Sequence, residues 1–293
     1  NQQIPKFDEL NTDIVREALT GVKPESYDSE LQSVVRPPTL CAGCPHRGFF
    51  QAIKKKKGLM INGDIGCYTL GANAPLNALD TAICMGASLS MAHGAAQAYK
   101  VAGAKTKAVG VLGDSTFFHS GITSLMDAVY NQSDSISVIL DNRITGMTGH
   151  QENPGTGFTL MGKPAPEVDI PALVKAVGIK EENIYTVNPL HLDEVDKVLD
   201  ACIASEEPTV IITRWPCVLK KFSQQDLDEF KGLHQTQCHI IQDKCRNCKA
   251  CVRTGCPALM SSKDDVVIDV NSCVGCTVCK QVCPFDAIEE VQR

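Results

Sequence analysis

The chain has 293 residues, 28 basic and 34 acidic side chains, a net charge of −6 and 43% hydrophobic residues. This composition is typical of a globular protein with about two domains, and it excludes fibrous and disordered classes. The mildly acidic balance disfavours a nucleic-acid-binding protein, because no basic face dominates. No apolar run reaches the roughly 18 residues that a membrane-spanning helix needs, so none is predicted.

The 15 cysteines are the unusual feature of this composition, and eight of them lie between Cys245 and Cys283. A secreted, disulfide-stabilised protein would be short and would carry a signal peptide. Residues 1–5 have neither the charged nor the apolar region of such a peptide, and they include no initiator Met. We therefore expect metal-binding cysteines in a reducing, cytoplasmic location, and a chain that is processed, truncated or part of a longer polypeptide.

The first 36 residues are predicted to be a connector. One short helix is expected from Thr12 to Leu19, because Gly21 is a typical helix end. A polar stretch follows, and Pro37-Pro38 closes it. No pattern in this segment indicates catalysis.

Residues 37–232 are predicted to form an α/β domain with a mainly parallel sheet. Short apolar runs recur there, as in strands that are buried on both faces. Helix-like stretches separate these runs, and this alternation predicts a parallel sheet that binds ligands outside the carboxyl ends of its strands. The predicted strands are residues 58–61, 108–112, 136–140 and 209–213, and the predicted helices are residues 82–102, 121–131 and 192–204.

The composition changes sharply beyond a polar link at residues 222–238, which contains a short predicted helix at residues 224–230. We place a domain boundary near residue 233, so that residues 233–293 form a second domain. This domain contains two copies of one cysteine motif. The copies read Cys245-x2-Cys248-x2-Cys251-x4-Cys256-Pro257 and Cys273-x2-Cys276-x2-Cys279-x3-Cys283-Pro284.

The second copy has the spacing of the bacterial ferredoxin run, in which the fourth cysteine binds the other cluster. Zinc ribbons use paired CxxC motifs instead, and zinc or free thiols are the alternative interpretation. The tail resembles an α+β ferredoxin with two [4Fe–4S] clusters, which implies one-electron transfer. The implied ligand sets are crossed: Cys245, Cys248, Cys251 and Cys283 for one cluster, and Cys256, Cys273, Cys276 and Cys279 for the other.

A second motif lies in the α/β domain. Gly113-Asp114-Ser115 directly follows one predicted strand, and Asn142 follows the next. Glycine permits a tight turn, and Asp114 and Asn142 offer the hard oxygen ligands that Mg²⁺ shares with phosphates. The pattern resembles the thiamine diphosphate motif and implies a thiamine diphosphate-binding fold. Alone, it also fits an ordinary turn followed by a turn asparagine.

The segment around Asn142 resembles its counterpart in 2-oxoacid:ferredoxin oxidoreductases. It reads Asp141-Asn142-Arg143-Ile144-Thr145-Gly146-Met147-Thr148-Gly149-His150-Gln151. In that family the residue matching Ile144 gives its backbone carbonyl to Mg²⁺, and the resemblance also implies Thr145 and Thr148 as cofactor-binding residues. Thr145 stands where an aromatic residue is frequent, and His150 stands in place of glycine. Both departures are expected to alter the pocket.

Four further cysteines are candidates for a third cluster. They occur in Cys41-x2-Cys44-Pro45-His46-Arg47, in Gly66-Cys67-Tyr68 and in Pro216-Cys217. By itself, the CxxC pair also fits a redox dithiol or half of a zinc site. In the same family, cysteines at matching positions hold a [4Fe–4S] cluster close to thiamine. The resemblance therefore implies Cys41, Cys44, Cys67 and Cys217 as ligands, with Gly66, Cys67 and Tyr68 beside the cofactor.

Other residues carry weaker signals. Cys84 and Cys202 lie on apolar helix-like faces and are interpreted as small hydrophobic residues, whereas Cys238 stays unassigned. Lys54-Lys55-Lys56-Lys57 is interpreted as a solvated helix end or as a docking site for an acidic partner. His93 belongs to a segment that resembles the family's HG segment beside thiamine, and it is a candidate cofactor-binding and catalytic residue.

From about residue 8, the chain resembles the C-terminal half of the alpha subunits of indolepyruvate:ferredoxin oxidoreductases. The connector at residues 9–15, the run 41–47, residues 63–71 and the fused ferredoxin tail carry this resemblance. In that family, an N-terminal half supplies the domain that binds the aminopyrimidine ring and the Glu that activates the cofactor. We recognise neither here, so this chain alone is not expected to be a complete active site.

The resemblance implies oxidative decarboxylation of an aryl 2-oxoacid such as indolepyruvate. Thiamine diphosphate, Mg²⁺ and three [4Fe–4S] clusters are the expected cofactors, and coenzyme A is the expected co-substrate. Electrons would leave through the tail to ferredoxin. The other expected partners are the N-terminal half, in the same or a separate polypeptide, and a gamma-type or beta subunit, in a hetero-oligomer without nucleic acid or membrane. Two alternatives stay open: another 2-oxoacid (pyruvate, branched-chain or 2-oxoglutarate), or a non-catalytic electron-transfer subunit.

Overall fold

A computed structural model describes residues 4–6, 9–25 and 34–293 of the chain. The chain divides into two compact units, Asn1–Pro37 and Pro38–Arg293, and each is described by itself. The first unit contains helix α1 (Thr12–Thr20), where a helix is predicted. The side chain of Asn11 accepts hydrogen bonds from the backbone N–H groups of Asp13 and Ile14, and Gly21 ends the helix in a left-handed conformation.

The second unit is built around a six-stranded sheet in the order β2-β1-β3-β4-β6-β5. All five strand pairs are parallel, which confirms the predicted α/β class. Every residue of β4, and all but the ends of β3 and β6, are buried, as their apolar composition predicts. The strands are β1 (Leu59–Gly63), β2 (Thr81–Ala82), β3 (Lys107–Gly113), β4 (Ile136–Asp141), β5 (Ile184–Val187) and β6 (Thr209–Arg214).

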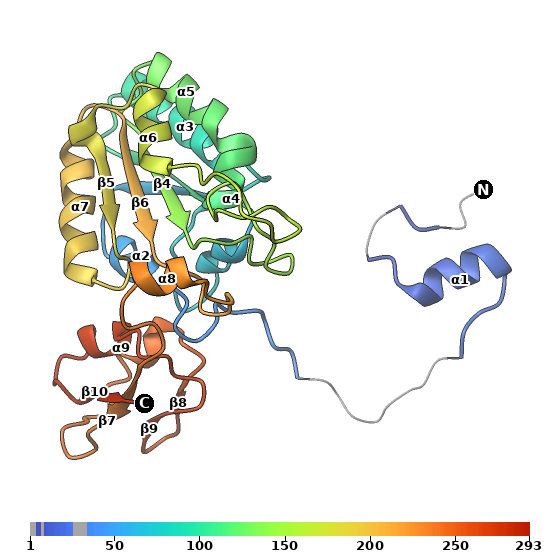
Figure 1. Ribbon diagram of the computed structural model, residues 1–293, viewed down its shortest axis with the longest axis vertical. Coiled ribbons are helices and arrows are strands. Elements are labelled where there is room, and N and C mark those ends of the chain that lie inside the picture. Colours follow the sequence, from blue (N-terminus) through green and yellow to red (C-terminus); the bar gives the residue numbers. More distant parts are fainter. Residues whose placement is uncertain (1–3, 7–8, 26–33) are drawn as a thin grey trace. The chain divides into compact units, whose positions relative to one another are not determined.

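Helices cover both faces of this sheet (Figure 1). On one face, α2 (His46–Ile53) and α7 (Leu192–Ala204) pack against a core that includes Phe50, Leu199 and Val111. On the other face, the core includes side chains of α3 (Ala87–Ala102), α5 (Ile122–Tyr130) and α6 (Ile170–Ala176). Two short elements, α4 (Asp114–Thr116) and the π-helical turn Phe117–Gly121, connect β3 to α5. Among the residues that the structure describes, no helix combines the length and apolar character needed to cross a bilayer.

The cysteine-rich tail consists of two small antiparallel sheets. Strand β7 (Thr236–Ile240) pairs with β10 (Ile288–Gln292), and β8 (Leu259–Ser261) pairs with β9 (Val266–Ile268). Two short helices, α8 (Gln224–Glu229) and α9 (Val278–Gln281), lie before and within it.

The tail is packed against the α/β part. Arg47 of α2 donates a hydrogen bond to the carbonyl of Thr254 at 2.8 Å, and Gln281 of α9 donates to the carbonyl of Leu190 at 2.7 Å. Both parts therefore belong to the unit Pro38–Arg293. The domain boundary near residue 233 stays a prediction.

Candidate active site

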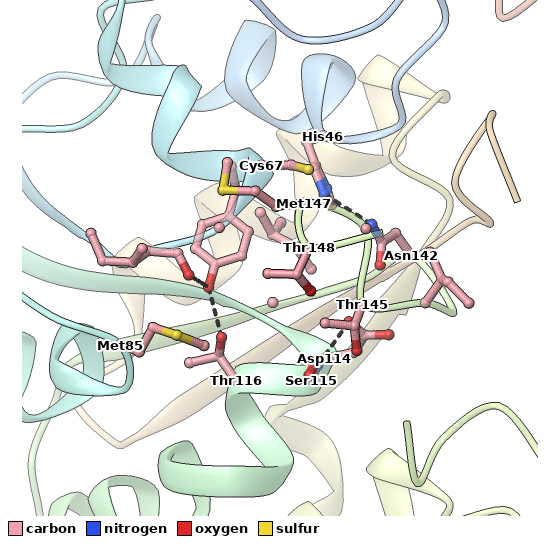
Figure 2. Close-up of a pocket in the computed structure, with 17 residues that line it drawn as sticks. His46, Cys67, Met85, Asp114, Ser115, Thr116, Asn142, Thr145, Met147 and Thr148 are labelled. Carbon is pink, nitrogen blue, oxygen red and sulfur yellow. Dashed lines mark hydrogen bonds between the residues drawn. The ribbon is translucent and has the colours of Figure 1, made fainter. Parts of the chain in front are cut away.

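A pocket opens at the carboxyl ends of β1, β3 and β4, where parallel sheets bind their ligands (Figure 2). Three segments that follow these strands form most of its wall. All of the predicted cofactor-binding residues except His93 line it: Gly66, Cys67, Tyr68, Gly113, Asp114, Ser115, Asn142, Ile144, Thr145 and Thr148. Other lining residues, which the predicted site does not include, are His46, Ile65, Met85, Thr116, Leu140, Gly146 and Met147.

Tyr68 is a fixed wall of the pocket. Its hydroxyl lies 2.9 Å from both the carbonyl of Ile65 and Oγ1 of Thr116. A Cβ atom on Gly113 would lie 2.6 Å from Cε1 of Tyr68, and one on Gly66 would lie 2.5 Å from the same atom. Real Cβ atoms do not approach this closely, so the aromatic ring occupies the space that the two glycines leave free.

Asp114 supplies a buried carboxylate at the start of α4. It accepts hydrogen bonds from the backbone N–H of Ser115 at 2.8 Å and from the side-chain amide of Asn153 at 3.1 Å. Burial, and then the negative charge of Asp141, raise the pKa of Asp114 well above the usual range of an aspartate. A divalent cation next to this carboxylate would offset the cost of ionising it, so the residue fits a Mg²⁺ ligand.

Asn142 and Ile144 also line this wall. The amide nitrogen of Asn142 lies 3.4 Å from Nε2 of His46, which leaves the amide oxygen for a ligand. Burial lowers the pKa of His46 to about 4, so the ring is neutral near pH 7 and its nitrogen can accept the amide N–H. The backbone carbonyl of Asn142 is used elsewhere, because it accepts from the N–H of Cys217 at 2.9 Å.

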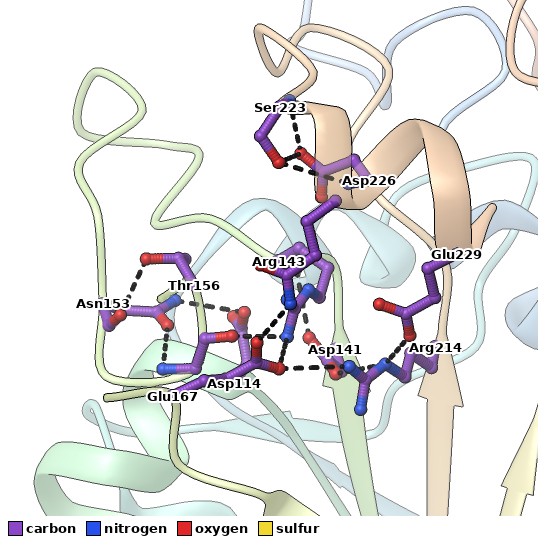
Figure 3. A network of polar contacts seen from close by, with 12 residues as sticks. Asp114, Asp141, Arg143, Asn153, Thr156, Glu167, Arg214, Ser223, Asp226 and Glu229 are labelled. Carbon is purple, nitrogen blue, oxygen red and sulfur yellow. Dashed lines mark hydrogen bonds and ion pairs between the residues drawn. The ribbon is translucent and has the colours of Figure 1, made fainter. Parts of the chain in front are cut away.

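A buried polar network holds the loop that follows Asn142 (Figure 3). Arg143 has a left-handed backbone, with φ of 61°, and its guanidinium is 2.6 Å from Glu167 and also donates to the carbonyl of Gly155. Arg214 at the end of β6 lies 3.3 Å from the same Glu167. Burial by itself raises the pKa of Glu167. The hydrogen bond and the positive charge of Arg143 outweigh this effect, so the pKa lies below its usual value. The network therefore ties both ends of the loop to the sheet.

The structure brings the four proposed proximal cysteines to one place beside this pocket. Cys41 and Cys44 precede α2, Cys67 follows β1, and Cys217 follows β6. Burial and the nearby thiols of Cys217 and Cys41 raise the pKa of both Cys44 and Cys67. Cys67 also lines the pocket, and Sγ of Cys217 lies 3.9 Å from Nε2 of His150.

The tail cysteines gather in the two crossed groups. One cavity is lined by Cys245, Cys248, Cys251 and Cys283. A second cavity is lined by Cys256, Cys273, Cys276 and Cys279, together with Cys238. In the described part of the chain, no three His, Cys, Asp or Glu side chains converge on a position for a single metal ion. In a [4Fe–4S] cluster, by contrast, each iron takes its own thiolate, so the cysteine sulfur atoms do not converge on a single ion.

Some candidate residues lie away from these groups. His93 of α3 faces Asp127 of α5, with 3.8 Å between Nε2 and Oδ2, and it does not line the pocket. Cys202 is packed in the core beneath α7, as its apolar surroundings predict, whereas Cys84 is exposed rather than buried. Cys238, which the sequence leaves unassigned, is buried, and its backbone N–H donates to Sγ of Cys273 at 3.2 Å.

Comparison with known proteins defines the class. The family described as "Thiamine pyrophosphate enzyme, C-terminal TPP binding domain" matches residues 64–213, which contain β2 to β5, most of β6 and the pocket segments that follow β1, β3 and β4. A 4Fe-4S binding domain matches residues 266–289, which contain the second cysteine motif. The chain therefore belongs to the thiamine pyrophosphate enzyme family and carries a 4Fe-4S binding domain in its tail.

Individual relatives narrow this class. The chain is 39% identical to indolepyruvate oxidoreductase subunit IorA of Archaeoglobus fulgidus, over 92% of this chain and 42% of the relative. It is 36% identical to the subunit of the same name from Methanothermobacter thermautotrophicus, over 98% of this chain and 46% of the relative. The chain thus spans less than half the length of these curated relatives.

A solved structure shares the fold. The 2-oxoglutarate:ferredoxin oxidoreductase from Magnetococcus marinus superimposes with a TM-score of 0.54, covering 69% of this chain and 71% of that chain. Their sequences are 16% identical, so this likeness concerns the fold alone.

Proposed function

We propose that this chain is the thiamine-binding and electron-transferring part of a 2-oxoacid:ferredoxin oxidoreductase. Its reaction would be the oxidative decarboxylation of an aryl 2-oxoacid, of the indolepyruvate type, to the acyl-CoA. One observation carries the proposal: Cys67 belongs both to the pocket that contains Asp114 and to the group of four proximal cysteines. The names of the curated relatives support the same activity and substrate.

Residues of the pocket have distinct roles in this proposal. Asp114, Asn142 and the backbone carbonyl of Ile144 would hold Mg²⁺, and Gly113, Ser115 and Thr148 would face the diphosphate. When bound, thiamine diphosphate supplies the stabilisation of the negative charge that decarboxylation creates. Tyr68 would limit the pocket beside Gly113, since its ring packs on that glycine and its hydroxyl is held by two contacts of 2.9 Å.

Contacts between the loops support an order for electron transfer. Gly43, between the proximal Cys41 and Cys44, approaches Val274 so closely that a Cβ atom would overlap it, and Val274 lies between Cys273 and Cys276. The neighbouring Ala42 packs against the hydrophobic cluster of the tail. Electrons would therefore pass from the proximal cluster to the cluster bound by Cys256, Cys273, Cys276 and Cys279. The cluster bound by Cys245, Cys248, Cys251 and Cys283 would be the last, and ferredoxin would accept from it.

The activity requires more than this chain. The relatives are more than twice as long, so an N-terminal half, in the same or a separate polypeptide, would complete the active site. A gamma-type or beta subunit would complete a hetero-oligomer. Coenzyme A would take the acyl group.

The test is cofactor analysis of the natural full-length protein purified without oxygen. Thiamine diphosphate, Mg²⁺, iron and sulfide are measured per chain, and 2-oxoacid-dependent ferredoxin reduction is then measured with indolepyruvate, pyruvate, 2-oxoglutarate and a branched-chain 2-oxoacid. We expect thiamine diphosphate, three clusters per chain and the fastest reduction with indolepyruvate. Clusters without thiamine would instead indicate an electron-transfer subunit, and a different fastest substrate would correct the specificity.

A further inference from the structure

A groove with a volume of about 580 Å³ lies between the end of α2 and the cysteine-rich tail. Lys54, Lys55 and Arg253 supply positive charge to its wall, and Val282 and Pro284 supply an apolar surface. Cys283, a proposed ligand of the last cluster, also lines it. The groove thus combines a basic rim with close access to a cluster loop.

The positive charge of this groove is not neutralised within the described part of the chain. No ion pair there involves Lys54, Lys55 or Arg253, whereas the neighbouring Lys56 lies 3.3 Å from Asp196 and 2.7 Å from Asp200. Burial and the charges of Lys55 and Arg253 lower the pKa of Lys54, which shows how closely the cations gather. This concentration occurs in a chain whose net charge is −6.

Hydrogen bonds connect two of these cations, Lys54 and Arg253, to the cluster loop. Lys54 and Gln51 of α2 both donate to the backbone carbonyl of Arg253, each at 3.4 Å. The guanidinium of Arg253 donates to the backbone carbonyl of Cys248 at 3.0 Å. Charges anchored in this way attract and orient an anionic surface, because association between complementary patches is steered by electrostatics.

We propose that this basic groove is the docking surface for an acidic electron-carrier protein. The carrier would be a small iron–sulfur protein with a surplus of carboxylates around its own cluster. Its carboxylates would pair with Lys54, Lys55 and Arg253, which brings its cluster next to the loop of Cys283. One electron would then leave the reduced cluster of this chain, and the oxidised cluster of the carrier would be reduced by it. This inference rests on the proposed electron-transfer function.

The test measures electron transfer without any 2-oxoacid chemistry. The full-length protein is reduced with dithionite, freed of excess reductant and mixed with an oxidised, acidic two-[4Fe–4S] ferredoxin. The second-order rate constant is recorded at roughly 10 mM and 500 mM salt, where the screening lengths are about 30 Å and below 8 Å. A failure of the thiamine chemistry does not affect this measurement, so the two proposals are tested separately.

The variants are Lys54→Glu/Lys55→Glu and, because Lys54 contacts Arg253, Lys55→Glu alone. Lys57→Glu is the matched control, since Lys57 is exposed, has the same charge and does not line the groove. We expect the double variant to lower the low-salt rate constant at least tenfold, the single variant to lower it several-fold, and the control to change it less than twofold. At high salt the differences should shrink. Iron content and reduction of a small neutral quinone should match the parent.

Three outcomes would overturn the proposal. If Lys57→Glu lowers the low-salt rate constant as much as the groove variants do, the effect is a general one of net charge. If the double variant keeps the parent rate constant, the carrier docks elsewhere. A double variant that binds coenzyme A more weakly but reduces ferredoxin at the parent rate would assign the groove to a phosphate-bearing ligand.

Discussion

Replacing Gly113 with alanine tests whether Tyr68 is the fixed wall that the structure shows. The added Cβ would lie 2.6 Å from Cε1 of the tyrosine. The ring cannot move away easily, because Tyr68 is 5% exposed and its hydroxyl is held by two contacts of 2.9 Å. Overpacking of this kind typically costs about 1–3 kcal/mol. We expect Tm to fall by about 5 °C, since roughly 1 kcal/mol corresponds to a few degrees in a chain of this size.

The assay is thermal unfolding of parent and variants at one scan rate, with Gly94→Ala as the matched control. Gly94 lies inside α3 with nothing within 4 Å of an added Cβ, so alanine there should stabilise the protein by about 0.5–1 kcal/mol. Gly113→Ala is then repeated in a Tyr68→Leu background, which lacks the clashing atom. Its cost should fall below about 0.5 kcal/mol there. An unchanged Tm for Gly113→Ala, or the same loss in both backgrounds, would refute the reasoning.

Four further predictions concern the site. Asp114→Ala should abolish Mg²⁺-dependent thiamine binding while iron content stays at the parent value. In the parent, thiamine binding measured by calorimetry should strengthen as pH rises from 6, because the raised pKa of Asp114 makes a proton compete with Mg²⁺; a flat profile would contradict this. Cys67→Ala should lower the iron and sulfide content per chain by the amount that one [4Fe–4S] cluster contains, and an unchanged iron content would exclude Cys67 as a ligand. Glu167→Gln should destabilise the protein by about 2 kcal/mol in thermal unfolding, because Arg143, which is 3% exposed, loses its charged partner; an unchanged Tm would contradict this role of the network.

The buried strands were the most predictable part of the fold. β3, β4 and β6 lie in the middle of the sheet, so their side chains are apolar on both faces and appear as continuous runs. Helix α7 has the predicted bounds, since its apolar residues recur at the helical period over Leu192–Ala204. Local pattern and tertiary burial agree in these elements.

Elements whose limits depend on distant residues were not predictable. Helix α3 is predicted from residue 82, but it begins at Ala87, because the buried carboxylate of Asp64 accepts the backbone N–H groups of Gly86 and Ser88 at 2.9 and 3.1 Å. Helix α2 was not among the predicted helices, although Lys54-Lys55-Lys56-Lys57 was interpreted as a helix end. Its polar side chains Arg47 and Gln51 are buried, because they donate hydrogen bonds to backbone carbonyls of the tail rather than to solvent.

The residues of the candidate site divide in the same way, into those that local spacing indicates and those that distant parts of the chain contribute. Motif spacing predicts Asp114, Asn142 and the tail cysteines as ligands, because the chemistry of Mg²⁺ and of iron–sulfur clusters restricts which residues occur at which spacing. Spacing did not identify Asn153, which hydrogen-bonds Asp114 from a loop 39 residues away. It also did not reveal that Lys54 and Lys55 lie beside Cys283.

The sequence by itself thus determined the parallel α/β class, the thiamine motif and the two cysteine motifs of the tail, since each depends on residue type at short range. Tertiary structure alone decided that Asn153 and His46 contact Asp114 and Asn142 at the pocket, and that a basic groove lies beside the loop of Cys283. The physical reason is that these sites are built where separate strand ends and the docked tail meet, and packing of the two parts, rather than local spacing, determines which side chains become neighbours.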